Sequence, residues 1–161
     1  MKMSIVKDYE LSASRFIEIH CDDGDYTVIV SDRNEPIYHE AELIGVRWAK
    51  FLTYIDEIDT RVKAGCVETF QEHIGGGWYV SLSPGYKCVN IRQWYKNDKG
   101  ETKPTRQGIA LRLPEWEKLK EVLRCVPVDV PQLTNYQVCF HLGQLEWLDC
   151  RECHPFGYED L

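Results

Sequence analysis

Aromatic and cationic residues are interleaved along residues 78–106, in a pattern that could bind a single-stranded nucleic acid. The aromatic residues are Trp78, Tyr79, Tyr86, Trp94 and Tyr95, and the cations are Lys87, Arg92, Lys96, Lys99, Lys103 and Arg106. Cations neutralise phosphates, and aromatic rings stack on unpaired bases at about 1–3 kcal/mol per base. The alternative is an ordinary sheet surface with aromatic cross-strand pairs.

The net charge of −7 is an average over three unlike segments. Residues 1–73 hold 8 Lys and Arg against 15 Asp and Glu, residues 74–125 hold 10 against 5, and residues 126–161 hold 1 against 6. A local positive field attracts anions even when the whole molecule is negative. The distribution favours an anion-binding middle segment, with charge fluctuation along solvated faces as the alternative.

The cysteines near the C-terminus raise the question of a metal. Cys139, Cys150, Cys153 and His154 could supply four zinc ligands, because thiolates and imidazole suit a tetrahedral site. A single Cys-x-x-Cys pair is weak evidence for such a site, so we expect free thiols and no metal. The odd total of 7 cysteines and the lack of an export signal predict a reducing compartment, the cytosol or nucleus.

The sequence lacks the patterns typical of catalysis. No histidines have HExxH spacing, no Ser or Cys lies in a nucleophile elbow, and Gly75–Gly77 lacks the Gly-Lys-Ser/Thr of a phosphate loop. No stretch approaches the ~18 apolar residues of a membrane helix. We therefore expect a binding protein with no enzymatic activity, no cofactor and no membrane partner.

Periodicity in the first half predicts two strands and a long helix. Alternation indicates a strand over 15–21, a turn at 22–25 and a return strand over 26–30. Apolar residues at helical spacing predict a helix from about Ala41 to Val62. These elements form an acidic strand-strand-helix unit.

The second half repeats this order. Strands are predicted over 78–83 and 86–95, with a turn at Pro84–Gly85 and a further short strand over 108–112. A helix is predicted from Pro114 to about Cys125, ending before Pro127. In the middle strand, Val89 and Ile91 should face the core, and Asn90, Arg92 and Trp94 the other side. Alternation over 136–142 predicts one more strand in the tail.

These elements predict an α+β fold of curved antiparallel sheets, each followed by a helix. We divide the chain into residues 1–73, 74–125 and 126–161. Trp48–Phe51 resembles Trp116–Leu119, so one interpretation is an internal duplication that folds as its own pseudo-dimer. The alternatives are a likeness shared by any two amphipathic helices, and a true homodimer.

The motifs over Gly76–Leu123 resemble the C-terminal domain of the positive cofactor four family of transcriptional coactivators. They are Trp78–Ser81, Val89–Tyr95, Asp98–Leu111 and Pro114–Lys120, in the family's order and close to its spacing. The resemblance implies a dimeric fold of curved four-stranded sheets with helices at its core. It also implies binding of single-stranded or melted DNA, contact with the transcription machinery and a nuclear location.

The resemblance also implies a set of DNA-binding residues: Lys87, Arg92, Trp94, Tyr95, Lys103 and Arg106. Arg92 would contact the DNA backbone, and Lys103 and Arg106 would contact phosphates. Tyr95 takes the place of the family's stacking tryptophan, and Trp94 is the alternative stacking residue. Gly108 would be needed because of the backbone at its position and not because of a contact with DNA.

Two departures from the family pattern bear on DNA binding. Gln107 stands where a second cation is usual, and the first half carries Asp22, Asp23, Asp25 and Asp32, which would repel phosphate. We therefore expect at most one DNA-binding surface. The alternative function is a protein-interaction module that kept the fold, lost DNA binding and contacts basic partners.

Overall fold

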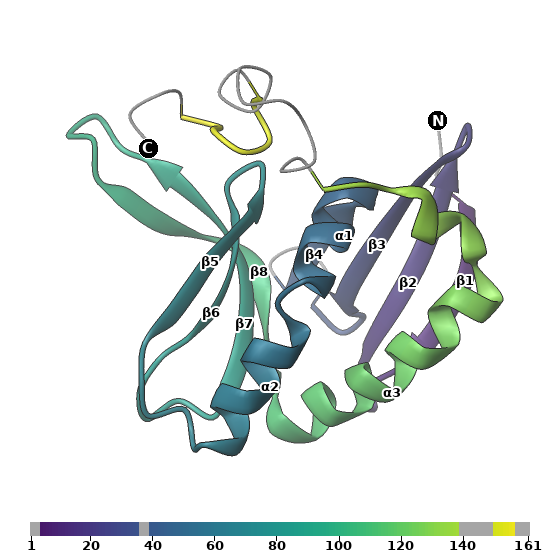
Figure 1. Ribbon diagram of the computed structural model, residues 1–161, viewed down its shortest axis with the longest axis horizontal. Helices are drawn as coiled ribbons and strands as arrows, with labels where there is room; N and C mark the ends of the chain where they lie inside the picture. Colours follow the sequence, from purple (N-terminus) through teal and green to yellow (C-terminus); the bar gives the residue numbers. More distant parts are fainter. Residues whose placement is uncertain (1–3, 36–38, 139–149, 157–161) are drawn as a thin grey trace.

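Two four-stranded antiparallel sheets lie on either side of the helices in the computed structural model of the protein, which describes residues 4–35, 39–138 and 150–156 (Figure 1). Neighbouring strands in each sheet follow chain order. The first sheet contains β1 (Ser4–Glu10), β2 (Arg15–Asp22), β3 (Asp25–Asp32) and β4 (Glu40–Ile44). The second contains β5 (Phe70–Gly75), β6 (Trp78–Leu82), β7 (Cys88–Lys96) and β8 (Thr102–Arg112).

Each sheet is followed directly by helical segments. The first leads into α1 (Gly45–Leu52) and α2 (Ile55–Lys63), and the second into α3 (Leu113–Asp129) and the short 3₁₀ helix η1 (Pro131–Asn135). The predicted α+β fold, with antiparallel sheets each followed by a helix, is confirmed. No helix in the described part of the chain is long and apolar enough to cross a membrane.

The long helix predicted over residues 41–62 is wrong at its start and its middle. Residues 40–44 form strand β4, in which buried Ala41 and Leu43 pair with Val30 and Val28 of β3. The helical region then breaks between α1 and α2, where Thr53 and Tyr54 bond back to carbonyls of the last turn of α1. Periodicity could not separate a short strand joined to a helix from one continuous helix.

Two edge strands were not predicted. Every residue of β1 is at least partly exposed, so this strand lacks the alternating burial that marks a half-buried strand. Strand β5 crosses the expected boundary between residues 73 and 74. The short strand predicted over 108–112 is the end of the much longer β8, which contains Pro104.

The C-terminal predictions also need correction. Helix α3 continues past Pro127 to Asp129, and Val130 N donates to Val126 O at 2.8 Å. Pro127 has no N–H to donate to the carbonyl of Leu123, so the helix continues past it with one hydrogen bond fewer. Residues 136–138 are not a strand, and the rest of the strand predicted to residue 142 lies outside the described residues.

One hydrophobic core serves both sheets. Trp48 and Phe51 of α1 and Trp116 of α3 are almost completely buried at its centre. The ring centroids of Trp48 and Phe51 are 5.7 Å apart, and those of Phe51 and Trp116 are 6.5 Å apart. The helices thus cover the inner faces of the sheets, and the outer faces stay open for function.

The two halves also meet where β4 contacts β8. Gln107 Nε2 donates to the carbonyl of Glu40 at 3.0 Å. Arg15 of β2 donates to the carbonyl of Ala110 and to the carboxylate of Glu115. Gln107, which stands where the resembled family usually has a cation, therefore joins the two sheets.

Candidate nucleic-acid interface

The outer face of the second sheet is polar and aromatic. Along β6 and β7, the buried Val80, Val89 and Ile91 face the core, as predicted for the last two. The alternate residues face outward, and strand pairing sets Ser81 beside Asn90 and Tyr79 beside Arg92. This face gathers side chains that can stack, donate and accept.

A groove of about 400 Å³ crosses this face. It is lined by Thr69, Phe70, Gln71, Ser81, Leu82, Ser83, Asn90, Arg92, Trp94, Pro104, Thr105 and Arg106. The structure thus brings together three of the six predicted binding residues, Arg92, Trp94 and Arg106. Lys87, Tyr95 and Lys103 do not line the groove.

Three rings form a ladder across the outer face, one each from β5, β6 and β7. The ring centroids of His73 and Tyr79 are 5.0 Å apart, and those of Tyr79 and Trp94 are 5.9 Å apart with a 62° angle between the planes. Trp94 therefore lies on the same face as Arg92. Tyr95 is the next residue along the strand and is 48% exposed; by alternation it belongs to the opposite face.

Arg92 is held in place by the backbone of β8. Its Nη1 donates to the carbonyls of Thr105 at 3.1 Å and Arg106 at 3.0 Å. Burial lowers the pKa of Arg92, although a guanidinium remains charged at neutral pH. Nε and Nη2 make no hydrogen bond to the described residues, so they can still bind an anion.

The other predicted cations lie at the margins. Arg106 is exposed on β8 at the rim of the groove. The exposed Lys103 ammonium is 3.3 Å from the Glu101 carboxylate, and Lys87 is exposed in the turn before β7. The β7–β8 hairpin, which carries Lys103 and Tyr95 near its tip, extends away from the rest of the molecule (Figure 1).

Residues 84–122 match the family model described as Transcriptional Coactivator p15 (PC4). The match runs from the turn after β6 through most of α3 and includes all six predicted binding residues. The match covers 39 of the 161 residues, and the family that it names is one of transcriptional coactivators. No solved structure matches the chain.

Sequence reasoning missed much of the groove that adjoins this coactivator-like segment. Gln71, Ser81 and Asn90 line it from three neighbouring strands. Alternation along β7 already placed Asn90 on the outer face, and the same reading of β6 would have placed Ser81 there. Gln71 could not be found because β5 was not predicted.

The outer face of the first sheet is acidic. Arg33 stacks on Phe16, with its guanidinium carbon 3.6 Å from the ring centroid, and pairs with Asp8 and Glu18. Burial, followed by the charges of Glu42 and Glu18, raises the pKa of Glu40. Among the described residues no cation pairs with Glu40 or Glu42, so this face is unsuited to phosphate.

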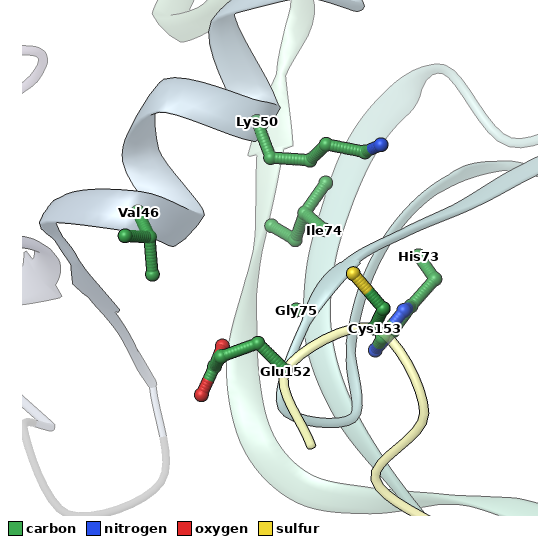
Figure 2. A pocket seen from close by; sticks show the side chains of 7 residues that line it. All are labelled: Val46, Lys50, His73, Ile74, Gly75, Glu152 and Cys153. Atoms are coloured by element: carbon green, nitrogen blue, oxygen red, sulfur yellow. The ribbon is translucent and has the colours of Figure 1, made fainter. Parts of the chain in front are cut away.

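A second cavity, of about 170 Å³, lies between α1, β5 and residues 152–153 of the C-terminal segment (Figure 2). Glu152 makes a bidentate ion pair with Arg47 of α1, with N···O distances of 2.7 and 2.8 Å. Gly76 N also donates to Glu152 O at 2.9 Å. His73 lines this cavity and is also the first ring of the aromatic ladder. The C-terminal segment is therefore anchored at one end of the outer face.

The zinc hypothesis concerns this same segment. Cys150, Cys153 and His154 are described, whereas Cys139 lies outside the described residues. Within the described ranges, no three His, Cys, Asp or Glu side chains are grouped as metal ligands.

Proposed function

We propose that the protein binds single-stranded or melted DNA through the groove of the second sheet and acts in nuclear transcription as a coactivator. This proposal rests on one observation. Arg92, Trp94 and Arg106 line the same groove, and all three lie in the coactivator-like segment. Cations at the rim would neutralise phosphates, and Trp94 would stack on an unpaired base.

We further propose that only one of the two sheets binds DNA. The outer face of the first sheet carries Glu18, Glu40 and Glu42 where a second DNA surface would need cations. Both halves have the order of four strands followed by helix, which supports an internal pseudo-dimer. The proposed acidic half, DNA-binding half and acidic tail are residues 1–73, 74–125 and 126–161, and β5 and α3 extend across the two boundaries.

The test is fluorescence anisotropy with a labelled oligo(dT) of ~20 nucleotides at low and moderate salt. Affinity should fall as salt rises, by about 0.7 log units per log unit of salt for each phosphate neutralised. Arg106→Ala should weaken binding and reduce this slope by about that amount. Arg124→Ala removes the same charge from the exposed side of α3 and serves as the matched control.

A protein-interaction module is the second candidate function. The observation that favours it is the set of uncompensated carboxylates on the first sheet, where Glu40 and Glu42 lack cationic partners in the described chain. A basic segment of a partner protein would supply the missing charge. Absence of oligo(dT) binding even at low salt would overturn the DNA proposal and leave this candidate.

A further inference from the structure

We propose that the groove discriminates among unpaired bases, and that Asn90 favours bases with an exocyclic amino group, cytosine and adenine, over thymine. This inference rests on the proposed function, because it concerns the same groove. Contacts with phosphates and stacking on bases tolerate any sequence, whereas this contact depends on the identity of the base.

The geometry that supports it is a row of polar side chains across three strands. Strand pairing sets Gln71 of β5 beside Ser81 of β6, and Ser81 beside Asn90 of β7. All three line the groove together with Arg92 and Trp94. Asn90 and Trp94 are four residues apart, about 13 Å along β7, so the base next to one stacked on the Trp94 ring would present its edge near the amide and hydroxyl groups.

Two polar atoms at the groove have unused hydrogen-bonding capacity. Asn90 Oδ1 and Trp94 Nε1 are shielded from solvent and make no hydrogen bond within the described chain. Such orphaned groups are rare in proteins, and each costs about 1–3 kcal/mol. The terminal torsion of an asparagine side chain is soft, so the Asn90 amide can turn toward a bound base.

The chemistry of the amide predicts which bases are favoured. An unpaired carbonyl oxygen needs a donor, and the N4 amino group of cytosine or the N6 amino group of adenine supplies one. Thymine presents the O4 acceptor at the corresponding place, so the only donor it offers to Asn90 Oδ1 is N3–H, one position further along its edge. A polar group shielded from water discriminates well, because water cannot replace the missing partner.

The first sheet shows that this row is not a general property of the fold. Its corresponding outer row, set by strand pairing, runs from Asp8 through Glu18 and Ile29 to Glu42. That row contains carboxylates and an aliphatic side chain and no amide. Base reading is thus confined to the face that also carries Arg92 and Trp94.

The experiment compares two labelled ~20-nucleotide strands by anisotropy: oligo(dT), and the same strand with about five central cytosines. The unmodified protein should bind the cytosine-containing strand about three- to tenfold more tightly. Asn90→Leu, which keeps a similar volume, should abolish this preference, so that the two strands bind with equal affinity. Arg106→Ala is the control and should weaken both strands equally, because it acts on phosphate.

A chemical variant of the DNA keeps the test independent of protein folding. Cytosine dimethylated on N4 has no amino hydrogen, so the unmodified protein should bind it no better than thymine. Equal affinity for all three strands would overturn the base-reading inference while the proposed DNA binding stands. Absence of binding to any strand at low salt would overturn both.

Discussion

Trp48 and Trp116 occupy the same place in the two halves of the protein, and the ring of Phe51 packs near both. Each is the fourth residue of the helix that directly follows its sheet. Their exposed fractions are 1% and 0%, and their ring centroids lie 5.7 and 6.5 Å from that of Phe51. The two helices therefore use one residue type at one position to build the shared core.

The surroundings of the two indoles differ, which yields a stability prediction. Trp116 Nε1 donates to Asp59 Oδ1 at 3.2 Å, whereas no such bond is found for Trp48 among the described residues. Trp116→Phe should lose about 1–2 kcal/mol more of unfolding free energy than Trp48→Phe, because a hydrogen bond to a charged group is lost as well as volume. Urea unfolding of both variants measures the difference. Equal losses would contradict it.

Asp59 also makes the stability depend on pH. Burial would raise the pKa of Asp59, but hydrogen bonds from Lys120, Lys63 and Trp116 outweigh it and lower the pKa to about 2. A carboxyl with a lowered folded-state pKa stabilises the protein above its unfolded-state value near 3.9, and this contribution is lost as the pH falls toward about 2. The loss should be about 2 kcal/mol.

The measurement is urea unfolding between about pH 2 and pH 5, compared with Asp59→Asn. The variant should be less stable at neutral pH and should lose less stability on acidification than the unmodified protein. Asp56→Asn replaces an exposed aspartate on the same helix and should leave the acid dependence unchanged. An identical pH slope in Asp59→Asn would show that this network does not stabilise the fold.

The strands predicted from the sequence are those with strong alternation between a buried and a polar face. In β2 and β7, Ile17, Ile19, Val89 and Ile91 are buried and their neighbours are not. Strand β4 was taken as helix because the helical spacing of apolar residues begins at Ile44, its last residue, and continues into α1. Local patterns cannot resolve such a junction, since pairing with β3 decides it.

The candidate groove was predicted only where one strand held several of its residues. Alternation along β7 placed Arg92 and Trp94 together on the outer face, as the structure does. The ladder from His73 through Tyr79 to Trp94 depends on the pairing of three consecutive strands, and the first of them, β5, was not predicted. The bonds from Arg92 to β8 carbonyls depend on the register of β7 and β8, which composition does not reveal.

Gly108 should be the least replaceable glycine near the groove. A Cβ atom there would lie 2.5 Å from Ile91 O and 2.7 Å from Arg92 Cα, and backbone atoms cannot move aside cheaply. Gly108→Ala should therefore lose at least about 1 kcal/mol more stability than Gly85→Ala, which strains only its own backbone. Gly85 is the matched control because nothing lies within 4 Å of its Cβ position. Similar thermal unfolding of both variants would contradict this account.

The anchor of the C-terminal segment can be tested by proteolysis. Because Arg47 holds both carboxylate oxygens of Glu152, Arg47→Gln should release the segment and expose the bond after Arg151 to trypsin. Cleavage there, followed by mass spectrometry, should become several-fold faster. Arg61→Gln removes an arginine that pairs with Glu57 and Glu68 instead, and should leave this rate unchanged. Unchanged cleavage in Arg47→Gln would show that the ion pair does not hold the segment.

The last prediction separates the two candidate stacking residues. Trp94 lies on the face of Arg92 and 5.9 Å from Tyr79 between ring centroids, whereas Tyr95 belongs to the other face of β7. Trp94→Leu should weaken oligo(dT) binding about 5- to 100-fold, the usual cost of one base–aromatic stack, and Tyr95→Leu should change it less than about twofold. Trp94→Phe keeps an aromatic face and should restore most of the affinity. A larger loss in Tyr95→Leu would show that DNA follows the exposed hairpin and not the groove, because only the hairpin presents Tyr95 to solvent.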